Sequence, residues 1–434
     1  MKVELLKKIK DRTACVGVIG QGYVGLPLAL EFAKAGFTTI GFDVDQAKVD
    51  RLNKGDSYII DVTNDELKKI VASGKFKATT DFSLLKQVDC VSTCVPTPLR
   101  KTKDPDISYI VASMDAVKKH MHKGMLITLE STTYPGTTDE LVKEPLEEMG
   151  YTTGKDLFVC FSPERVDPGN AKYNTKNTPK IIGGTTPACQ ELGHALYTSC
   201  IDTVHIVGST AEAEMVKLLE NTFRAVNIAL VNELMMMCDR MGINIWSVIT
   251  AAATKPFGFM PFYPGPGIGG HCIPLDPMYL SWKAKTVDFY NRFIELATDI
   301  NGNMPHYVMQ RIAKVLNEHT KPIKSSKILI LGMSYKPDID DLRESPALEV
   351  YRLLRREGAW VEYHDPHAPS FISMLGKTIK STPLTAELLK KQDLCVLLTN
   401  HKVFDYKFIV QHAPLILDTR NAFIGINTPN VVRL

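Results

Sequence analysis

Short apolar runs alternate with helical patterns in the first part of the chain. Residues 14–19 form an apolar run that ends in a glycine-rich turn, and residues 26–35 follow with a helical pattern closed by Gly36. A second apolar run, residues 38–42, ends at Asp43. A strand, a turn, a helix and a second strand in this order predict a βαβ unit.

Further apolar runs continue this alternation to residue 161. They lie at residues 88–93, 125–129 and 157–161, with helical segments between them. Strands that alternate with helices predict a parallel, doubly wound sheet covered on both faces.

The pattern changes at about residue 211 and changes back at about residue 320. Residues 211–240 form one long helical pattern without glycine or proline, and helices dominate to about residue 318. Strand and helix alternation then returns. The apolar runs of this last part lie at residues 327–331, 359–366, 394–398 and 415–417.

These patterns predict an α/β protein of three regions. We expect a Rossmann-like domain at 1–210, a central helical region at 211–320 and a second Rossmann-like domain at 321–434. Both end domains are expected to be doubly wound parallel sheets. The long helix between them can link the domains and form a dimer surface.

Composition and charge exclude several classes of protein. The 434 residues carry a formal net charge of only +3, so the chain lacks the electrostatic footprint of a nucleic-acid binder. No apolar stretch approaches the ~20 residues that cross a bilayer. The N-terminus has no apolar core of signal-peptide length. We expect a soluble, cytoplasmic protein with no nucleic-acid partner and no membrane partner.

One of the nine cysteines stands out. The odd count and irregular spacing argue against a disulfide framework, and Cys90 and Cys94 lack the second pair of a zinc site. Cys272, in contrast, follows four glycines within residues 265–270 and precedes Asp276 by four residues. This arrangement suits a loop that delivers a sulfur nucleophile to a bound substrate.

A dinucleotide fingerprint lies at residues 20–25. It follows a predicted strand, opens a predicted helix and has an acidic residue some twenty positions later. Gly20 allows the tight turn, Gly22 lets a pyrophosphate approach, and Gly25 lets helix and strand pack closely. Asp43 would bind the adenosine ribose and repel a 2′-phosphate, which favours NAD over NADP. Lys48 could contact a phosphate or lie on a solvated helix face.

The last domain lacks a full glycine fingerprint, and its loop after residue 332 leaves alternatives open. Tyr335 could stack on a base or pack in the core. Lys336 could neutralise a diphosphate or lie in solvent. Arg343 could reach the cofactor or pair with neighbouring acids.

Three separated motifs occur in a fixed order and resemble those of the UDP-glucose/GDP-mannose dehydrogenase family. They are GQGYVGLP at residues 20–27, GIGGHCIPLD at 267–276 and YKPDIDDLRES at 335–345. The resemblance covers nearly the whole chain. It implies a twofold, NAD-dependent oxidation of a sugar C6 alcohol to a carboxylate, in surface polysaccharide synthesis. It also implies an NAD domain, a central dimerisation region that makes a homodimer or a higher homo-oligomer through the central helix, and a UDP-sugar domain.

The same resemblance implies a role for each residue that matches a family motif, and it implies no metal. The implied catalytic residues are Cys272 as nucleophile, Lys217 and Asn221 as oxyanion stabilisers on one helix face, Asp276 as the catalytic aspartate, and Glu164 and Thr132 beside the hydrolytic water. The implied cofactor contacts are Gly20, Gly22, Tyr23, Val24, Gly25, Asp43, Lys48, Thr97 and Arg343. The implied substrate contacts are Arg165, Tyr263, Gly269, Tyr335, Lys336 and Arg420.

Some of these residues keep a second interpretation. Asp276 could simply cap the following helix, because Pro277 suits a first helical position. Arg165 and Arg224 could hold an N-acetyl group or a sugar hydroxyl, or could form surface ion pairs. His271 is expected to position backbone or contact substrate, although it could be a base.

Departures from the UDP-glucose enzymes resemble enzymes for UDP-N-acetylhexosamines. They lie at residues 165–169, at His271 and at 222–224, and the IPLDP stretch at 273–277 favours UDP-N-acetylglucosamine. UDP-glucose and UDP-N-acetylmannosamine remain alternative substrates. A single-oxidation dehydrogenase of the 2-hydroxy acid or 6-phosphogluconate type, and a catalytically silent nucleotide-sugar sensor, are the alternative classes.

Overall fold

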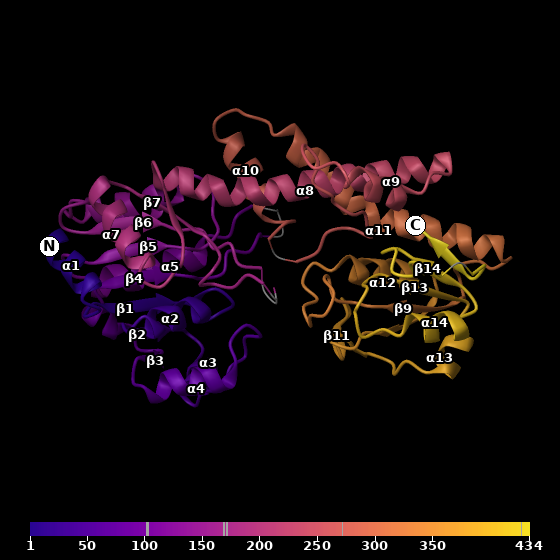
Figure 1. The fold of residues 1–434 in the computed structure, drawn as a ribbon, viewed down its shortest axis with the longest axis horizontal. Coiled ribbons are helices and arrows are strands. Elements are labelled where there is room, and N and C mark those ends of the chain that lie inside the picture. Colours follow the sequence, from indigo (N-terminus) through magenta and orange to yellow (C-terminus); the bar gives the residue numbers. More distant parts are fainter. Residues whose placement is uncertain (101–103, 168–169, 171, 271, 427) are drawn as a thin grey trace. The chain divides into compact units, whose positions relative to one another are not determined.

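The computed structural model describes residues 1–100, 104–167, 170, 172–270, 272–426 and 428–434 (Figure 1). Pro168, Gly169 and His271 lie outside the described residues. The chain divides into two compact units. Unit 1 comprises Met1–Glu220 and Met278–Phe289, and unit 2 comprises Asn221–Pro277 and Tyr290–Leu434.

Unit 1 is built on an eight-stranded sheet with the order β3-β2-β1-β4-β5-β6-β7-β8. Neighbouring strands are parallel, except that β7 runs antiparallel to β6. The chain reverses its direction of winding between β1 and β4, as a doubly wound sheet does. The strands are β1 (Cys15–Ile19), β2 (Thr38–Phe42), β3 (Phe76–Thr79), β4 (Cys90–Thr93), β5 (Leu126–Leu129), β6 (Phe158–Phe161), β7 (Lys180–Gly184) and β8 (Val204–Val207).

Helices cover both faces of this sheet and bury a separate apolar core on each. Along β1, Val16 and Val18 face one core and Ile19 faces the other, because alternate strand residues point to opposite faces. Helices α1, α2, α4 and α7 pack on the first face, and α5 and α6 on the second. The helices are α1 (Lys2–Lys10), α2 (Gly25–Lys34), α3 (Gln46–Asn53), α4 (Asn64–Ala72), α5 (Ser108–His120), α6 (Glu144–Glu148) and α7 (Pro187–Tyr197), with a 3₁₀ turn η1 (Phe82–Gln87) and a π turn η2 (Asp139–Lys143).

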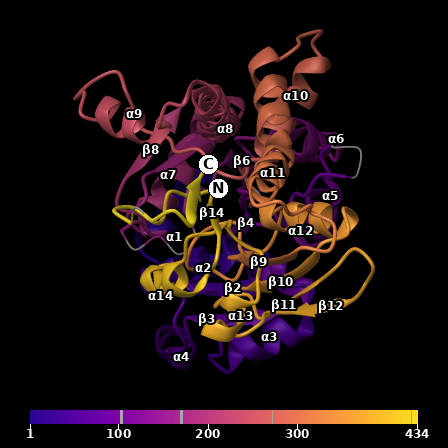
Figure 2. The ribbon, with the colours of Figure 1, turned by 90° about the vertical axis from the view of Figure 1, so that its right-hand side faces the viewer.

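Unit 2 contains a second parallel sheet, of five strands in the order β10-β9-β13-β14-β15. Helices α11 and α12 pack beside each other on one face (Figure 2), and α13 and α14 cover the other. The strands are β9 (Lys327–Leu331), β10 (Trp360–His364), β13 (Leu394–Leu397), β14 (Ile416–Asp418) and β15 (Val431–Arg433), with a separate hairpin of β11 (Ser370–Ile372) and β12 (Thr378–Lys380). The helices are α9 (Ile245–Ala252), α11 (Arg292–Glu318), α12 (Pro346–Arg356), α13 (Ala386–Lys390) and α14 (Tyr406–His412).

Two helices contribute residues to both units: α8 (Thr210–Met241) and α10 (Asp276–Lys285). The predicted long helix is therefore present. It ends at Met241, and the positive φ of 67° at the following Gly242 takes the chain out of the helix. The predicted fold class is confirmed. No helix among the described residues is long and apolar enough to span a membrane.

The start of α8 is fixed to unit 1 by a buried carboxylate. Glu214 accepts hydrogen bonds from the amides of Gly136 and Thr138, at 2.6 and 2.8 Å, and from the Thr138 hydroxyl at 2.7 Å. Burial raises the pKa of Glu214 to about 7. This anchor holds the helical turn that carries Lys217.

Candidate active site

The glycine-rich turn of unit 1 distinguishes glycines needed for packing from one that is not. A Cβ on Gly20 would lie 2.6 Å from the Cys94 carbonyl oxygen, and one on Gly25 would lie 1.8 Å from the Gly20 carbonyl oxygen. A Cβ on Gly22 would meet nothing within 4 Å. Packing within the chain therefore explains Gly20 and Gly25, whereas the space at Gly22 is open to a ligand.

Asp43 lies directly after β2 and is tied to the same turn. Its carboxylate accepts the amide of Gln21 at 2.9 Å and the amide of Asp45 at 3.0 Å. The side chain is buried, so its orientation is fixed beside the glycine turn before any ligand binds.

The surroundings of the other predicted cofactor contacts in unit 1 point less clearly to a ligand. Tyr23 is exposed, and Val24 immediately precedes α2. Lys48 is half-buried, with its ammonium 5.9 Å from the centre of the Tyr58 ring, so it is not a fully solvated surface lysine. The Thr97 carbonyl accepts the Tyr279 hydroxyl at 2.8 Å.

Glu164 and Lys217, both predicted catalytic residues, are directly connected in unit 1. The Lys217 ammonium donates to the Glu164 carbonyl oxygen at 2.6 Å. One carboxylate oxygen of Glu164 accepts the amides of Arg165 and Val166, each at 2.8 Å. Thr132 is half-buried in the loop after β5.

The Arg165 side chain forms an ion pair with a neighbouring carboxylate. Its guanidinium donates to both carboxylate oxygens of Glu220, at 2.6 and 3.3 Å, and to the Pro179 carbonyl at 2.6 Å. Of the two interpretations of Arg165, the ion pair is the one present here, and the substrate contact stays a prediction.

Three residues that the sequence did not single out are connected to Glu164, one of them by direct contact. Lys180 contacts the carboxylates of Glu130 and Glu164, and Tyr197 donates to Glu130. A lysine that opens a buried strand is the one local signal for this group, because the partners lie far apart in sequence.

In unit 2, Cys272 lies in the turn that leads into α10. Its carbonyl accepts the amides of Leu275 and Asp276, at 3.1 and 2.8 Å, which closes one helical turn. The buried Asp276 carboxylate accepts the Asn221 amide at 2.5 Å. Three predicted catalytic residues are therefore linked within this unit, and Asp276 is the first residue of α10.

The glycines before Cys272 make room for a neighbour within the chain. A Cβ on Gly269 would lie 2.4 Å from the Tyr335 Cβ, and one on Gly270 would lie 2.9 Å from the Tyr335 ring. The Gly270 amide donates to the Arg343 carbonyl at 3.0 Å. Packing against Tyr335 thus accounts for both glycines, and a substrate contact at Gly269 stays a prediction.

The remaining predicted contact residues of unit 2 differ in their neighbours and in their exposure. Tyr263 stacks on Trp246, with 6.0 Å between ring centroids. Arg343 is exposed and pairs with Asp341, its terminal nitrogen 2.6 Å from a carboxylate oxygen. Lys336 is half-buried.

Arg420 is a half-buried cation without a carboxylate partner among the described residues. It donates to the Leu398 carbonyl at 2.9 Å, and burial lowers its pKa to about 10. A Cβ on Gly265 would lie 2.5 Å from its guanidinium, so glycine leaves the space that Arg420 fills. The nearby Asp418 carboxylate accepts the Arg420 backbone amide at 3.0 Å, and its charge acts on the guanidinium without a direct ion pair. A guanidinium in this setting suits an anionic ligand.

Asp365, directly after β10, repeats the setting of Asp43 with more partners. It accepts the amides of Met333 and Ser334, at 2.6 and 3.0 Å, and the Nε2–H of the buried His401 at 3.1 Å. Burial would raise the pKa of Asp365, but the hydrogen bonds from His401 and these amides hold it well below its usual range.

His401 also belongs to a cluster with Asp338 and His367 whose ligand atoms lie within 4.8 Å of one another. Its Nδ1 accepts the Asp338 amide at 3.0 Å, so Nε2 carries the proton that it donates to Asp365. Both ring nitrogens are therefore occupied, and His401 offers no lone pair to a metal ion in this arrangement.

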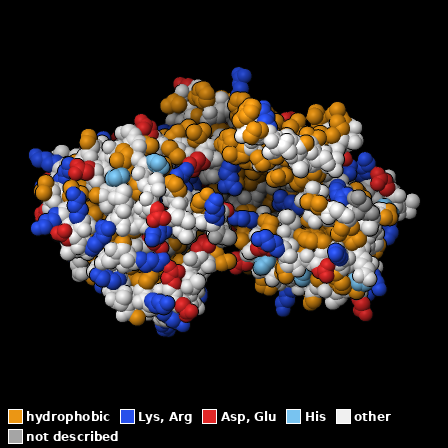
Figure 3. All heavy atoms as spheres, in the orientation of Figure 1, with side chains coloured by type: hydrophobic (Ala, Val, Ile, Leu, Met, Phe, Trp, Pro, Cys, Tyr) orange, Lys and Arg blue, Asp and Glu red, His pale blue; other side chains and the backbone are white. Residues whose placement is uncertain are grey.

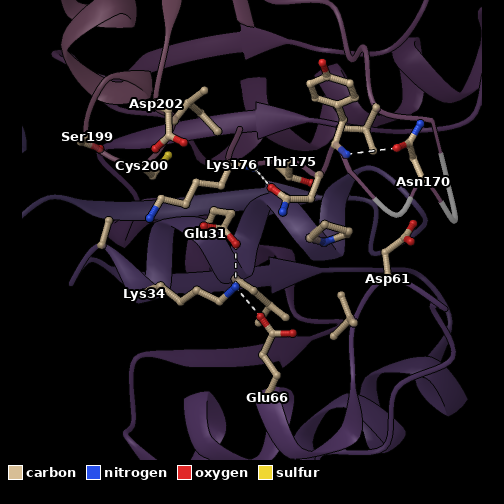
Figure 4. Close-up of a pocket in the computed structure, with 18 of the residues that line it drawn as sticks. Glu31, Lys34, Asp61, Glu66, Asn170, Thr175, Lys176, Ser199, Cys200 and Asp202 are labelled. Carbon is tan, nitrogen blue, oxygen red and sulfur yellow. Dashed lines mark hydrogen bonds and ion pairs between the residues drawn. The ribbon is translucent and has the colours of Figure 1, made fainter. Parts of the chain in front are cut away.

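A pocket of about 750 Å³ lies in unit 1 beside α2 (Figure 4). Of the predicted site residues, Tyr23 lines it. Lys34 projects toward Glu31 and Glu66 and forms an ion pair with each. Lys34 is thus paired within the chain, and the described residues that line the pocket include none of the predicted catalytic residues.

Comparison with known proteins identifies the family. Models of the UDP-glucose/GDP-mannose dehydrogenase family match residues 14–201 as its NAD binding domain, 211–303 as its central domain and 329–424 as its UDP binding domain. A UDP-N-acetyl-D-glucosamine 6-dehydrogenase of Pseudomonas aeruginosa is 35% identical over 353 residues, which cover 81% of this chain and 82% of the relative. A UDP-N-acetyl-D-mannosamine dehydrogenase of Campylobacter jejuni is 36% identical over 410 residues, 90% of this chain and 96% of the relative.

A solved structure agrees with these relatives. The UDP-D-ManNAc dehydrogenase of Pyrococcus horikoshii matches with a TM-score of 0.88 and 31% identity, over 96% of this chain and 98% of that one. The predicted resemblance and the predicted NAD cofactor are confirmed. The chain belongs to the UDP-glucose/GDP-mannose dehydrogenase family of NAD-dependent oxidoreductases.

Proposed function

We propose that this protein oxidises the C6 alcohol of a UDP-N-acetylhexosamine, which its motifs favour as UDP-N-acetylglucosamine, to the uronic acid. The overall change consumes one water and two NAD and yields two NADH and three protons. The observation that carries the proposal is the turn that joins Cys272 to the buried Asp276–Asn221 pair. The backbone of this turn brings Cys272 within one helical turn of Asp276, at the start of α10.

The turn at residues 20–25 fits NAD. The open space at Gly22 admits a pyrophosphate, and the fixed Asp43 carboxylate can accept ribose hydroxyls. When bound, NAD accepts one hydride at each of the two oxidation stages. Residues of the chain must transfer the protons, form and break the carbon–sulfur bond, and activate the water.

Cys272 makes the second oxidation possible. An aldehyde cannot release a second hydride until a nucleophile has added to its carbon. The Cys272 thiolate adds to that carbon, and the carbonyl electron pair moves to oxygen, which gives the thiohemiacetal as its alkoxide. The carbon–oxygen double bond forms again as the second hydride leaves, and the product is a thioester. Asp276, with a water molecule, takes the hydroxyl proton at the first stage. Lys217 and Asn221 donate to the oxyanion of each tetrahedral stage.

Hydrolysis of the thioester is the proposed task of Glu164. Its carboxylate takes a proton from water while the water oxygen bonds to the thioester carbon. The carbon–sulfur bond then breaks, and Cys272 leaves as a thiolate. Thr132, in the loop after β5, is proposed to help hold this water.

The nucleotide end of the substrate is proposed to bind in unit 2. Arg420 supplies a guanidinium that forms no ion pair among the described residues, and the half-buried Lys336 supplies a second cation beside Tyr335. Together they suit a diphosphate and a base.

A substrate panel with NADH counting tests this proposal. UDP-N-acetylglucosamine is expected to give two NADH per sugar, with turnover at least tenfold above that of UDP-glucose. The relatives named above act, by their names, on N-acetylglucosamine or N-acetylmannosamine derivatives, so UDP-N-acetylmannosamine is the informative third substrate. Turnover of UDP-glucose alone would contradict the substrate, and one NADH per sugar would contradict the reaction. Tight UDP-sugar binding without any NADH would favour a sensor.

We further propose that the protein forms a homodimer through α8. Six large apolar residues, each 36–61% exposed, recur at spacings of four and seven along this helix: Met215, Leu219, Phe223, Leu230, Met237 and Met241. Figure 3 shows hydrophobic side chains gathered at the surface over α9 and the adjoining part of α8. An apolar stripe of this length is typical of a helix that pairs with another chain.

Light scattering tests the dimer. The wild type is expected at twice the chain mass of 48.3 kDa, and Leu230→Glu with Met237→Glu at the chain mass, because two buried carboxylates would oppose association. Met374→Glu, at an exposed site in the loop between β11 and β12, is the control that should leave the mass unchanged. A monomeric wild type would refute the dimer.

A further inference from the structure

A buried ion triad connects Glu164 to the core of unit 1. Lys180, the first residue of β7, places its ammonium 2.7 Å from a carboxylate oxygen of Glu130 and 3.3 Å from one of Glu164. The side chains of Lys180, Glu130 and Glu164 are 5%, 0% and 13% exposed. Behind them, Tyr197 donates to Glu130 and lies 3.0 Å from the Ser92 hydroxyl. Two carboxylates therefore share one ammonium away from solvent.

Stability alone gives weak grounds for such a group. A buried ion pair often contributes no more than apolar residues of the same volume, because desolvation offsets the attraction. The triad ends, however, at the one carboxylate for which hydrolysis of the thioester is proposed. An effect of the triad on Glu164 therefore explains these buried charges better than a contribution to the stability of the core does.

We infer that Lys180 is a positioning residue for Glu164: its ammonium, shared with Glu130, orients the Glu164 carboxylate and keeps it ionised for thioester hydrolysis. This inference rests on the hydrolytic role proposed for Glu164. The geometry supports the division of labour. One Glu164 oxygen is held by the amides of Arg165 and Val166. Among the described residues the other oxygen has the longer contact to Lys180, and it can also accept a water proton.

The surrounding charges agree with an ionised Glu164. Burial would raise its pKa, but Lys180, the two amides and Lys217 together lower it below the usual value. Burial raises the pKa of Glu130. Burial would lower the pKa of Lys180, yet the two carboxylates raise it.

Two further groups lie near this carboxylate. Burial raises the pKa of Cys94 well above its usual value, so this thiol is neutral. The Arg165 guanidinium is engaged by Glu220. Lys180 therefore remains the principal buried cation that acts on the Glu164 carboxylate.

The direction in which the pH profile of hydrolysis shifts tests the effect of Lys180 on Glu164. A depressed pKa keeps Glu164 ionised at neutral pH, and hydrolysis is lost only as pH falls through that value. Without the Lys180 charge the acid limb of the pH profile should move up by about 1–3 pH units, the usual effect of a nearby opposite charge. Without the Glu130 charge, Lys180 acts on Glu164 alone, so the limb should move down or stay.

The experiment follows thioester hydrolysis against pH in the full-length enzyme. Single turnovers with NAD and the UDP-sugar that gives two NADH are stopped by chemical quench, and release of the uronic acid is compared with formation of the second NADH. The variants are Glu130→Gln, Lys180→Met with Glu130→Gln, and Lys180→Arg. The double variant is used in place of Lys180→Met alone. The single variant would leave two buried carboxylates facing each other and could fail to fold.

The expected pattern is specific to an electrostatic role. The double variant should show the raised acid limb, Glu130→Gln should not, and Lys180→Arg should restore the wild-type profile. A uniform loss of rate in all three, without movement of the limb, would reduce Lys180 to a structural residue and overturn the inference. The variant Glu164→Gln distinguishes failure of the hydrolytic role proposed for Glu164 from failure of the positioning role inferred for Lys180. If it hydrolyses the thioester normally, the role of Glu164 itself fails; if it accumulates thioester while the double variant keeps the wild-type limb, only the inference fails.

Discussion

Replacing Cys272 with alanine is expected to abolish formation of the uronic acid, with a loss of about 10³-fold or more in turnover. Without the sulfur no thiohemiacetal forms, so the second hydride cannot leave. The residual reaction should stop at the aldehyde and yield at most one NADH per sugar. Steady-state NADH production together with product analysis measures both effects.

Cys15 provides the matched control for this variant. Cys15 and Cys272 are the two half-buried cysteines of the chain, and the other seven are buried. Burial raises the pKa of Cys15 to about 11, so its thiol is unreactive at neutral pH. Cys15→Ala should retain turnover within about twofold, as expected of a site without a catalytic role. Undiminished formation of acid by Cys272→Ala would contradict the covalent mechanism and favour a single-oxidation dehydrogenase.

Alanine at Gly22 and at Gly25 should have opposite consequences. At Gly25 the added methyl would lie 1.8 Å from the Gly20 carbonyl oxygen, so α2 could not keep its place against β1. A loss of about 4 kcal/mol or more in the free energy of unfolding is expected, or failure to fold. At Gly22 the methyl meets nothing in the chain, and stability should change by less than about 0.5 kcal/mol.

The Gly22 variant should instead lose NAD affinity. A methyl group between the turn and the pyrophosphate is expected to weaken binding by about 10- to 100-fold, equivalent to about 1–3 kcal/mol. Urea unfolding and calorimetric NAD titration separate the two effects. Wild-type affinity in Gly22→Ala would show that the pyrophosphate does not pass close to this backbone.

Features with local causes were predictable from the sequence. The glycine turn, Asp43 and the helix from 211 to 240 each follow from residues that are neighbours in the chain, and each is present. Strands β1, β2 and β9 were also found, because their apolar runs are bounded by turn residues.

Features that depend on distant partners were not predictable. Strand β8 was not identified, and two of its four residues are exposed, so it lacks a buried apolar run. Strand β7 was also missed; it ends in two glycines and pairs antiparallel with β6, against the pattern of the sheet. The same limit applies to the site. Nothing near Lys180 indicates Glu130, and nothing before Cys272 indicates that Tyr335 occupies the space beside Gly269 and Gly270.

The two aspartates that follow β2 and β10 differ in the number of acceptor positions they leave open. A carboxylate has about four lone-pair positions. Asp43 gives two of them to backbone amides and keeps the others for hydroxyl groups of a ligand. Asp365 receives six donors, four on one oxygen and two on the other, and is saturated. The carboxylate at this place therefore has acceptor positions left for the proposed ribose contact in the first sheet, and has none left in the second. The nucleotide proposed to bind in unit 2 would therefore be recognised by groups other than this acid, such as the cations and the aromatic ring named above.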